Sequence, residues 1–149
     1  MFDEAQSKNI ATELLAAMGV AAEIEVSNFN DQPYLNIESP DHAILIGRGG
    51  ENLRSLQYII NLILKHNIKD SPFVVVDVAG YKKERSQKIA HIAKEAADKA
   101  VSTSRDVRLK PMNSYERRLV HMHLAENPEV ETSSEGEEPH RTIIIKKRP

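Results

Sequence analysis

The sequence predicts an α+β fold in two parts, and three observations lead to this prediction. Residues 4–79 carry helical and strand-like patterns in the order helix, strand, strand, helix, glycine-rich turn, helix, strand. Residues 81–102 form a long helical pattern with many alanines on its apolar face. The rest of the chain predicts a short strand, a helix and two more strands. We therefore expect one domain at residues 1–79 and a small α/β domain, with a three-stranded sheet and two helices, at residues 80–149.

The first domain is expected to open with a helix and a hairpin. Apolar residues recur at helical spacing over residues 7–18, and Gly19 follows as a stop signal. Residues 22–26 and 34–38 alternate apolar and polar side chains, which is typical of strands with one buried face. Residues 27–33 between them are rich in turn-forming types, so the two strands should pair.

Two helices and a strand should complete the first domain. A Ser-Pro-Asp sequence is typical of a helix start and predicts a short helix at residues 42–46. A longer helix with a broad apolar stripe should run from about Glu51 to about Asn67. Residues 72–78 are apolar or β-branched at nearly every position, which predicts a strand buried on both faces.

The second domain should begin with the long helix at residues 81–102. Only Ala79-Gly80 separates it from the preceding strand, so we expect limited freedom between the two domains. Its apolar face is predicted to consist of Ile89, Ile92, Ala93, Ala96, Ala97 and Ala100.

The remaining elements are predicted from shorter signals. Residues 107–109, 130–133 and 142–147 predict strands. Residues 115–124 predict a helix for which Asn113 is a good N-cap. An acidic Ser-Glu-Gly-Glu-Glu-Pro segment should join the last two strands.

The composition indicates an aliphatic core and no cysteine chemistry. The 149 residues contain no cysteine, which excludes disulfides, thiol nucleophiles and zinc–thiolate sites and suits a reducing cytoplasm. No apolar run approaches the roughly 20 residues that span a bilayer, and the N-terminal residues do not form a signal peptide. We therefore expect a cytoplasmic protein without membrane insertion.

Charge is unevenly distributed, although the formal net charge is only −2. Residues 1–46 contain eight acidic residues and one basic residue, whereas residues 81–122 contain eleven basic and five acidic residues. A segregated basic region is typical of proteins that bind a polyanion. A solvated helix face with mixed charge would account for part of the same excess.

A glycine-rich turn, Gly47-Arg48-Gly49-Gly50, lies between the short helix and the longer one. Its glycines allow a sharp turn and a close approach of a ligand to the backbone. The start of the next helix and the Arg48 cation both favour an anion, and phosphate is the expected one. The spacing excludes a P-loop, and Asn52 stands where the dinucleotide fingerprint needs glycine. A plain turn between helices is the alternative.

With Ile46 before it, this turn resembles the Ile-Gly-x-x-Gly core of KH domains, and the order of elements over residues 4–79 is similar to the type II KH fold. The resemblance implies a narrow groove for single strands along residues 42–56 and 35–37. Its loop would clamp the backbone of about four nucleotides. Ile46 would line the groove beside the loop, and Leu35 and Ile37 would supply sheet packing near the bases. Arg54, one turn into the helix, is a second candidate contact, with an ordinary exposed arginine as the alternative.

In the second domain, Arg117 and His121 stand four residues apart on the predicted helix and so share one face. Their segment resembles the signature of the domain named for an arginine and a histidine separated by three residues, which binds single-stranded nucleic acid. The arginine would grip a phosphate, and the histidine would donate to a phosphate or stack on a base. Such a pair also occurs by chance on solvated helix faces. Further basic side chains would extend the contact: Lys82, Lys83, Arg85 and Arg118.

The two domains in this order resemble the Jag family of bacteria, also called SpoIIIJ-associated or KhpB proteins, from about residue 4 onward. The resemblance implies a non-catalytic single-stranded RNA-binding protein that acts as a post-transcriptional regulator or RNA chaperone. It also allows a small single-KH protein as partner, or self-association. Many members carry an additional N-terminal Jag-N domain and linker that this sequence lacks, either naturally or by trimming.

Two function classes other than RNA binding are compatible with parts of the sequence. A protein-interaction scaffold linked to cell-envelope or division functions is the main alternative, and single-stranded DNA is the alternative ligand. The open, cationic loop favours RNA. Enzymatic chemistry has little support, because the sequence has no His-Glu-x-x-His motif and no serine with an identifiable base beside it. We expect no cofactor and no metal.

Overall fold

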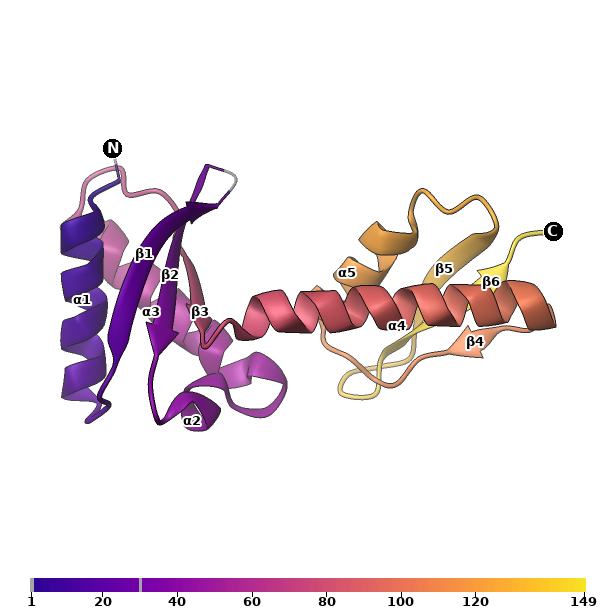
Figure 1. Cartoon of the computed structure of the whole chain (residues 1–149), viewed down its shortest axis with the longest axis horizontal. Helices are drawn as coiled ribbons and strands as arrows, with labels where there is room; N and C mark the ends of the chain where they lie inside the picture. Colours follow the sequence, from indigo (N-terminus) through magenta and orange to yellow (C-terminus); the bar gives the residue numbers. More distant parts are fainter. Residues whose placement is uncertain (1, 30) are drawn as a thin grey trace. The chain divides into compact units, whose positions relative to one another are not determined.

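The computed structural model describes residues 2–29 and 31–149, which fall into two compact units, Met1–Lys82 and Lys83–Pro149. The elements of the first unit follow the predicted order (Figure 1): α1 (Glu4–Ala17), β1 (Glu23–Phe29), β2 (Gln32–Glu38), α2 (His42–Ile46), a short 3-10 helix η1 (Arg48–Gly50), α3 (Glu51–Asn67) and β3 (Val75–Val78). The second unit contains most of α4 (Tyr81–Thr103), then β4 (Val107–Arg108), α5 (Ser114–Leu124), β5 (Val130–Glu135) and β6 (Thr142–Lys147). The α+β class is confirmed.

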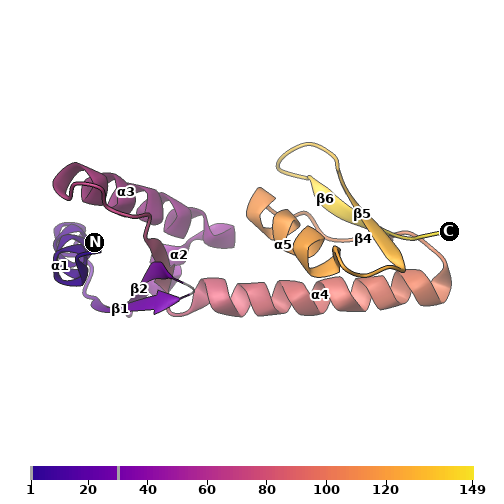
Figure 2. The same cartoon turned by 90° about the horizontal axis from the view of Figure 1, so that it is seen from above.

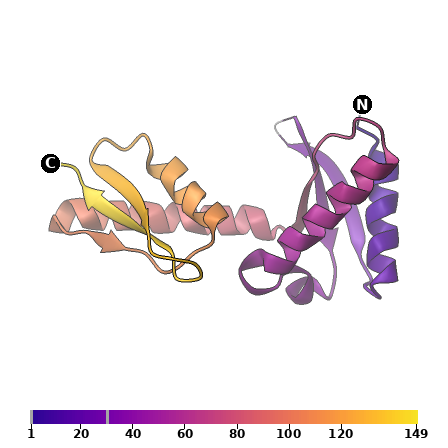
Figure 3. The ribbon, with the colours of Figure 1, turned by 180° about the vertical axis from the view of Figure 1, so that it is seen from behind.

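The first unit is a three-stranded sheet with two long helices on one face. The strand order is β1-β2-β3, in which β1 and β2 form the predicted antiparallel hairpin and β3 runs parallel to β2. Helices α1 and α3 pack beside each other against the sheet (Figure 3). The short α2 leads from β2 toward the start of α3.

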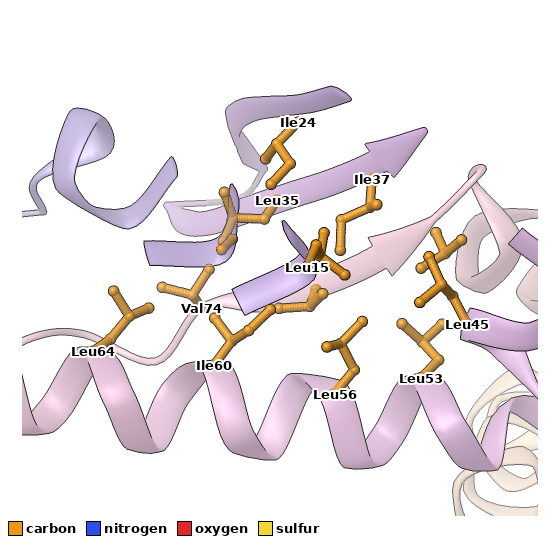
Figure 4. Packing of buried hydrophobic residues seen from close by; sticks show 13 residues of the cluster. Leu15, Ile24, Leu35, Ile37, Leu45, Leu53, Leu56, Ile60, Leu64 and Val74 are labelled. Atoms are coloured by element: carbon orange, nitrogen blue, oxygen red, sulfur yellow. The ribbon is translucent and has the colours of Figure 1, made fainter. Parts of the chain in front are cut away.

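The core of this unit lies between the sheet and the two helices. Leu15 of α1, Leu35 of β2 and Ile60 of α3 are almost completely buried, and their side chains point into the same space (Figure 4). Alternate residues of β2 are buried, which confirms the predicted strand with one face toward the core.

The hairpin is longer than its turn-forming residues predicted. The segment 27–33 was expected to be a turn, but its ends continue the two strands, and Asn28 pairs with Pro33. Proline is tolerated here because β3 pairs only with Tyr34–Ile37 of β2, so the missing N–H of Pro33 interrupts no ladder to β3. Asn30, within the predicted turn, lies outside the described residues.

The strand predicted at residues 72–78 begins only at Val75. Phe73, which was expected to be buried in it, is 46% exposed. The preceding Val74 is bonded by a side chain instead of a strand: Asn61 Oδ1 accepts from its N–H and Asn61 Nδ2 donates to its carbonyl, both at 2.8 Å. An amide of α3 therefore takes the place of a neighbouring strand at this edge of the sheet.

The second unit packs α4 and α5 with an antiparallel sheet of order β4-β6-β5. Residues of both helices share one hydrophobic cluster with β5 and β6, and Figure 2 shows α4 running beside the sheet. The predicted apolar face of α4 is confirmed except for Ile92, which is 36% exposed because it lies at the edge of the apolar stripe. Among the described residues, no helix is both long and apolar enough to cross a membrane.

Candidate nucleic-acid interface

The loop between α2 and α3 starts with a backbone conformation that requires glycine. Gly47 has φ 71° and ψ −178°, a region that is open essentially only to glycine. A Cβ atom at this position would also lie 2.6 Å from Cγ of Asn52, which is closer than van der Waals contact. Gly47 therefore sets the direction in which the chain leaves α2.

Asn52 bonds the two sides of this loop together. Its Nδ2 donates a 2.8 Å hydrogen bond to the carbonyl oxygen of Ile44, so the first turn of α3 is tied to α2. Within the loop, the Gly50 N–H donates to the Gly47 carbonyl at 3.3 Å. The sequence pattern gave Asn52 no role except to exclude a dinucleotide site. The signal that was missed is an amide in the first helical turn, from which a side chain can reach back to the preceding backbone.

Gly50 ends the loop against an aromatic ring. It has φ 78° in the left-handed region and is the N-cap of α3. A Cβ atom on Gly50 would lie 3.0 Å from Cε1 of Tyr81, and this tyrosine packs against the core of the first unit. Tyr81 was predicted only as the start of a helix. Nothing local in the sequence indicates that it supports a loop some thirty residues earlier.

The other side of the loop is open. Arg48 and Gly49 are exposed, and a Cβ atom on Gly49 would meet nothing within 4 Å. In the part of the chain that the structure describes, the Arg48 side chain has no hydrogen-bond or ion-pair partner. Arg54 is likewise exposed one turn into α3. The loop thus presents a cation on a glycine backbone that a ligand can approach closely.

The apolar side chains near the loop differ from those predicted. Ile46 is half-buried and packs against the core, whereas Ile44 of α2 is 70% exposed. Sequence reasoning missed Ile44, because a helix of five residues is too short for its periodicity to separate an inner from an outer face. Leu35 and Ile37 were expected to supply sheet packing near the bases. Both are 0% exposed and pack within the core, so they can act on a ligand only by supporting the surface above them.

Lys82 points inward toward a buried polar cluster. Asp77 is fully buried in β3 and accepts from the Val78 and Lys82 backbone N–H groups at 2.8 and 2.9 Å and from the Tyr34 hydroxyl. The Lys82 amine donates to Oε1 of Gln57. Burial lowers the pKa of Lys82 to about 8, although Asp77 acts in the opposite direction. The lone aspartate in an otherwise apolar strand was the available signal for this cluster.

In the second unit, α5 begins with a complete capping box. Asn113 accepts from the Glu116 N–H at 2.9 Å, and the Glu116 side chain accepts from the Asn113 N–H at 3.3 Å. Glu116 is buried and also forms a 2.6 Å ion pair with Nε of Arg85. Of the predicted basic contacts, Arg85 therefore has an internal partner, whereas Lys83 and Arg118 are exposed.

Arg117 and His121 lie one turn apart on α5, as their spacing predicted. Arg117 is only 8% exposed. Its NH1 donates to the Met112 carbonyl at 2.6 Å, and its NH2 is 2.8 Å from Oε1 of Glu138. His121 is half-buried, with Nδ1 2.6 Å from Oγ1 of Thr132 in β5. The arginine thus holds backbone and a carboxylate at once, which the sequence pattern did not indicate.

The structure thus places the predicted residues in two groups. The first unit contains the loop Gly47–Gly50 with Ile46, Arg54 and the inward-pointing Lys82, and the second contains Lys83, Arg85, Arg117, Arg118 and His121. Among the described residues, there is no group of three or more His, Cys, Asp or Glu side chains that could hold a metal ion.

Two family models match the chain, one for each unit. Residues 7–77 match the model described as KhpA/KhpB, KH domain. Residues 87–147 match the model of the domain named for an arginine and a histidine separated by three residues, called the Arg-x-x-x-His domain below. Both of the domain resemblances that the glycine loop and the Arg-x-x-x-His spacing predicted are therefore confirmed.

Curated proteins with similar sequences share one name. The RNA-binding protein KhpB of Clostridium symbiosum is 38% identical over 128 residues, which cover 86% of this chain and 58% of that protein. The protein of that name from Lactiplantibacillus plantarum is 34% identical, covering 86% of this chain and 40% of its own length. The one from Bacillus subtilis is 27% identical over 142 residues, covering 94% and 68%.

The chain therefore spans about half the length of the first two of these relatives, 58% and 40%. The two matched ranges follow the predicted order of the domains, and they include the glycine loop and the Arg117–His121 pair. The chain belongs to the KhpB family, with a KhpA/KhpB-type KH domain followed by an Arg-x-x-x-His domain.

Proposed function

We propose that this chain is a non-catalytic, cytoplasmic single-stranded RNA-binding protein that serves as a post-transcriptional regulator or RNA chaperone. The observation that carries the proposal is Arg48, an exposed cation on the glycine loop with no internal partner in the described part of the chain. The relatives from Clostridium symbiosum and Lactiplantibacillus plantarum are named as RNA-binding proteins, which supports the same ligand.

The roles follow from the chemistry of each group. Gly47, Gly49 and Gly50 let the RNA backbone come close, and Arg48 neutralises a phosphate. Arg54 adds a second cation along α3, and the exposed Ile44 offers an apolar surface to a base. With roughly four to six phosphates neutralised in total, the logarithm of affinity should fall with the logarithm of salt concentration with a slope of about −3 to −4.

The test compares binding of fluorescent single-stranded RNA, matching DNA and duplex RNA by anisotropy at two salt concentrations. The loop variant is Arg48→Asp with Gly49→Asp. It should fold, because Gly49 has open space for a side chain and aspartate tolerates its positive φ. The matched control is Lys65→Gln with Lys69→Asp, which changes the net charge equally near the other end of α3.

We expect the wild type and the control to bind single-stranded RNA and the loop variant to lose at least tenfold in affinity. Circular dichroism checks that each variant is folded. If the control loses as much as the loop variant, general charge rather than the loop carries binding. If the wild type binds no strand even at low salt, the RNA proposal fails. Equal affinity for DNA would make single-stranded nucleic acid in general the ligand.

A second candidate function, a protein-interaction module, is favoured by an exposed apolar surface on α3. Tyr58, Ile59 and Leu62 are 68%, 42% and 56% exposed and lie close together on the helix. A small single-KH protein or a second copy of this chain is the partner we propose for it. Light scattering should show a larger complex that Leu62→Glu disrupts. A wild-type monomer that also leaves an added single-KH protein unbound would remove this candidate.

A further inference from the structure

The acidic segment Ser134–Pro139, called the acidic loop below, was predicted to join the last two strands, but its first two residues continue β5 and only Gly136–Pro139 lie in the turn toward β6. The segment has a defined shape. It contains Glu135, Glu137 and Glu138. Arg141 holds its two sides together, because Nε donates to Oγ of Ser134 and NH1 donates to the Gly136 carbonyl, both at 2.9 Å. The loop is therefore fixed in a conformation that presents its carboxylates to neighbouring groups.

Glu138 is paired with Arg117, the arginine of the Arg-x-x-x-His motif. The distance from Oε1 to NH2 is 2.8 Å, and the exposed fractions of the two side chains are very different, 59% for Glu138 and 10% for Arg117. The NH1 group of this arginine is bonded inward to the Met112 carbonyl. The carboxylate thus lies on the outer side of a guanidinium that is otherwise buried.

The same segment lies close to a second basic side chain of this unit. At its first end, Oε2 of Glu135 lies 3.7 Å from NH2 of Arg108. The acidic loop therefore meets basic groups in a region where the sequence has an excess of positive charge. Acidic residues that served only to keep the hairpin soluble would not need the ion pairs with Arg108 and Arg117.

We propose that Glu138 is an internal competitor for nucleic-acid phosphate at Arg117. This proposal rests on the proposed function and adds to it a residue that sets which anions the second unit accepts. A carboxylate and a phosphate can each accept hydrogen bonds from a guanidinium through two oxygens, so they compete for the same donors. An ion pair with one largely exposed partner is weak enough to exchange. A free anion must displace the Glu138 carboxylate, which is always present beside Arg117. A nucleic-acid strand that is already held by other contacts supplies its phosphate at a high local concentration and displaces the carboxylate more easily.

The test removes the carboxylate charge of Glu138 without changing its shape. The variant is Glu138→Gln, and the matched control is Glu137→Gln, the neighbouring residue of the same loop, which forms no ion pair in the described part of the chain. Both remove one negative charge, so general attraction to RNA rises equally. We expect Glu138→Gln to bind single-stranded RNA about two- to fivefold more tightly than Glu137→Gln, since an exposed ion pair contributes free energy on that scale. Equal affinities, or a weaker Glu138→Gln, would overturn the proposal.

A second measurement does not depend on RNA binding. Inorganic phosphate is titrated against the protein, and the NMR signal of the Arg117 Nε–H group is followed in the wild type and in both variants. We expect Glu138→Gln to respond at a phosphate concentration several-fold lower than the other two proteins. If all three respond alike, Glu138 does not compete for the site. If phosphate behaves as expected but no protein binds RNA, the proposed function fails while the competition at Arg117 stands.

Discussion

The ring of Tyr81 lies against Gly50, so that a Cβ atom on this glycine would be 3.0 Å from Cε1 of the ring. Tyr81 is the first residue of α4, and its neighbours are fixed by side chains of the sheet. The Gly80 N–H donates to Oδ1 of Asn36 at 3.2 Å, and the Lys82 N–H donates to Oδ1 of Asp77 at 2.9 Å. The start of α4 therefore supports the glycine loop.

Removing this ring should loosen the loop. We expect Tyr81→Ala to weaken single-stranded RNA binding about three- to tenfold, because the loop loses its support at Gly50. Tyr81→Phe keeps the ring and should bind like the wild type. Anisotropy measures both affinities, and circular dichroism shows whether each variant is folded. A folded Tyr81→Ala protein with wild-type affinity would show that the loop does not depend on the ring.

Substitution of the loop glycines should separate the cost of a steric collision from the cost of a positive φ alone. We expect Gly47→Ala to lower the free energy of unfolding by about 2–4 kcal/mol, because its backbone region is closed to alanine and its Cβ would collide with Asn52. Gly49→Ala should cost only about 1 kcal/mol, since it has a positive φ but open space. Urea unfolding gives both values. Equal costs would mean that the contact with Asn52 is easily relieved.

The amide of Asn61 should stabilise the edge of the sheet. We expect Asn61→Leu to cost about 2–4 kcal/mol in the free energy of unfolding, because it leaves the buried N–H and carbonyl of Val74 without partners. Asn67→Leu is the matched control, an exposed amide of the same helix with one bond to the Ile63 carbonyl. It should change stability by less than about 0.5 kcal/mol. Chemical denaturation measures the free energy of unfolding of both variants. Similar losses in the two would show that the bonds from Asn61 to Val74 do not stabilise the sheet edge.

Lys82 should make stability depend on pH in a defined window. Its pKa is about 8 in the folded chain and 10.5 in the unfolded one, so the unfolded chain binds more protons between these values. Stability should therefore rise with pH from about 8 to 10.5, and below pH 8 the buried charge carries its full cost.

We expect Lys82→Met to raise the free energy of unfolding at pH 7 by about 1–3 kcal/mol, a range discounted because the amine keeps some solvent and a partner. The gain should shrink at pH 10, where the wild-type amine is neutral. Lys83→Met, at an exposed position, should show neither effect. Urea unfolding at both pH values measures this, and a Lys82→Met protein that is less stable at pH 7 would show that the charge is well compensated.

The sequence by itself determined the order of elements, both domain types and the glycine loop. These features depend on local signals: periodic apolar residues, an asparagine cap before α5, and glycines at positions where other residues are strained. The limits of the hairpin and of β3 were predicted less well. In the hairpin, strand pairing continued through the turn-forming residues. Before β3, bonds from Asn61 of α3 to Val74 took the place of strand pairing.

Only the tertiary structure decided which charges face solvent and which are internally paired. Arg48, Lys82 and Arg117 were all predicted to contact nucleic acid, Arg48 and Arg117 as cations of the two motifs and Lys82 as part of the basic stretch. In the folded chain Arg48 is exposed, Lys82 points at Gln57 and Arg117 is paired with Glu138. The sequence shows which side chains are charged. Which partner each charged side chain meets depends on how segments distant in the sequence pack together.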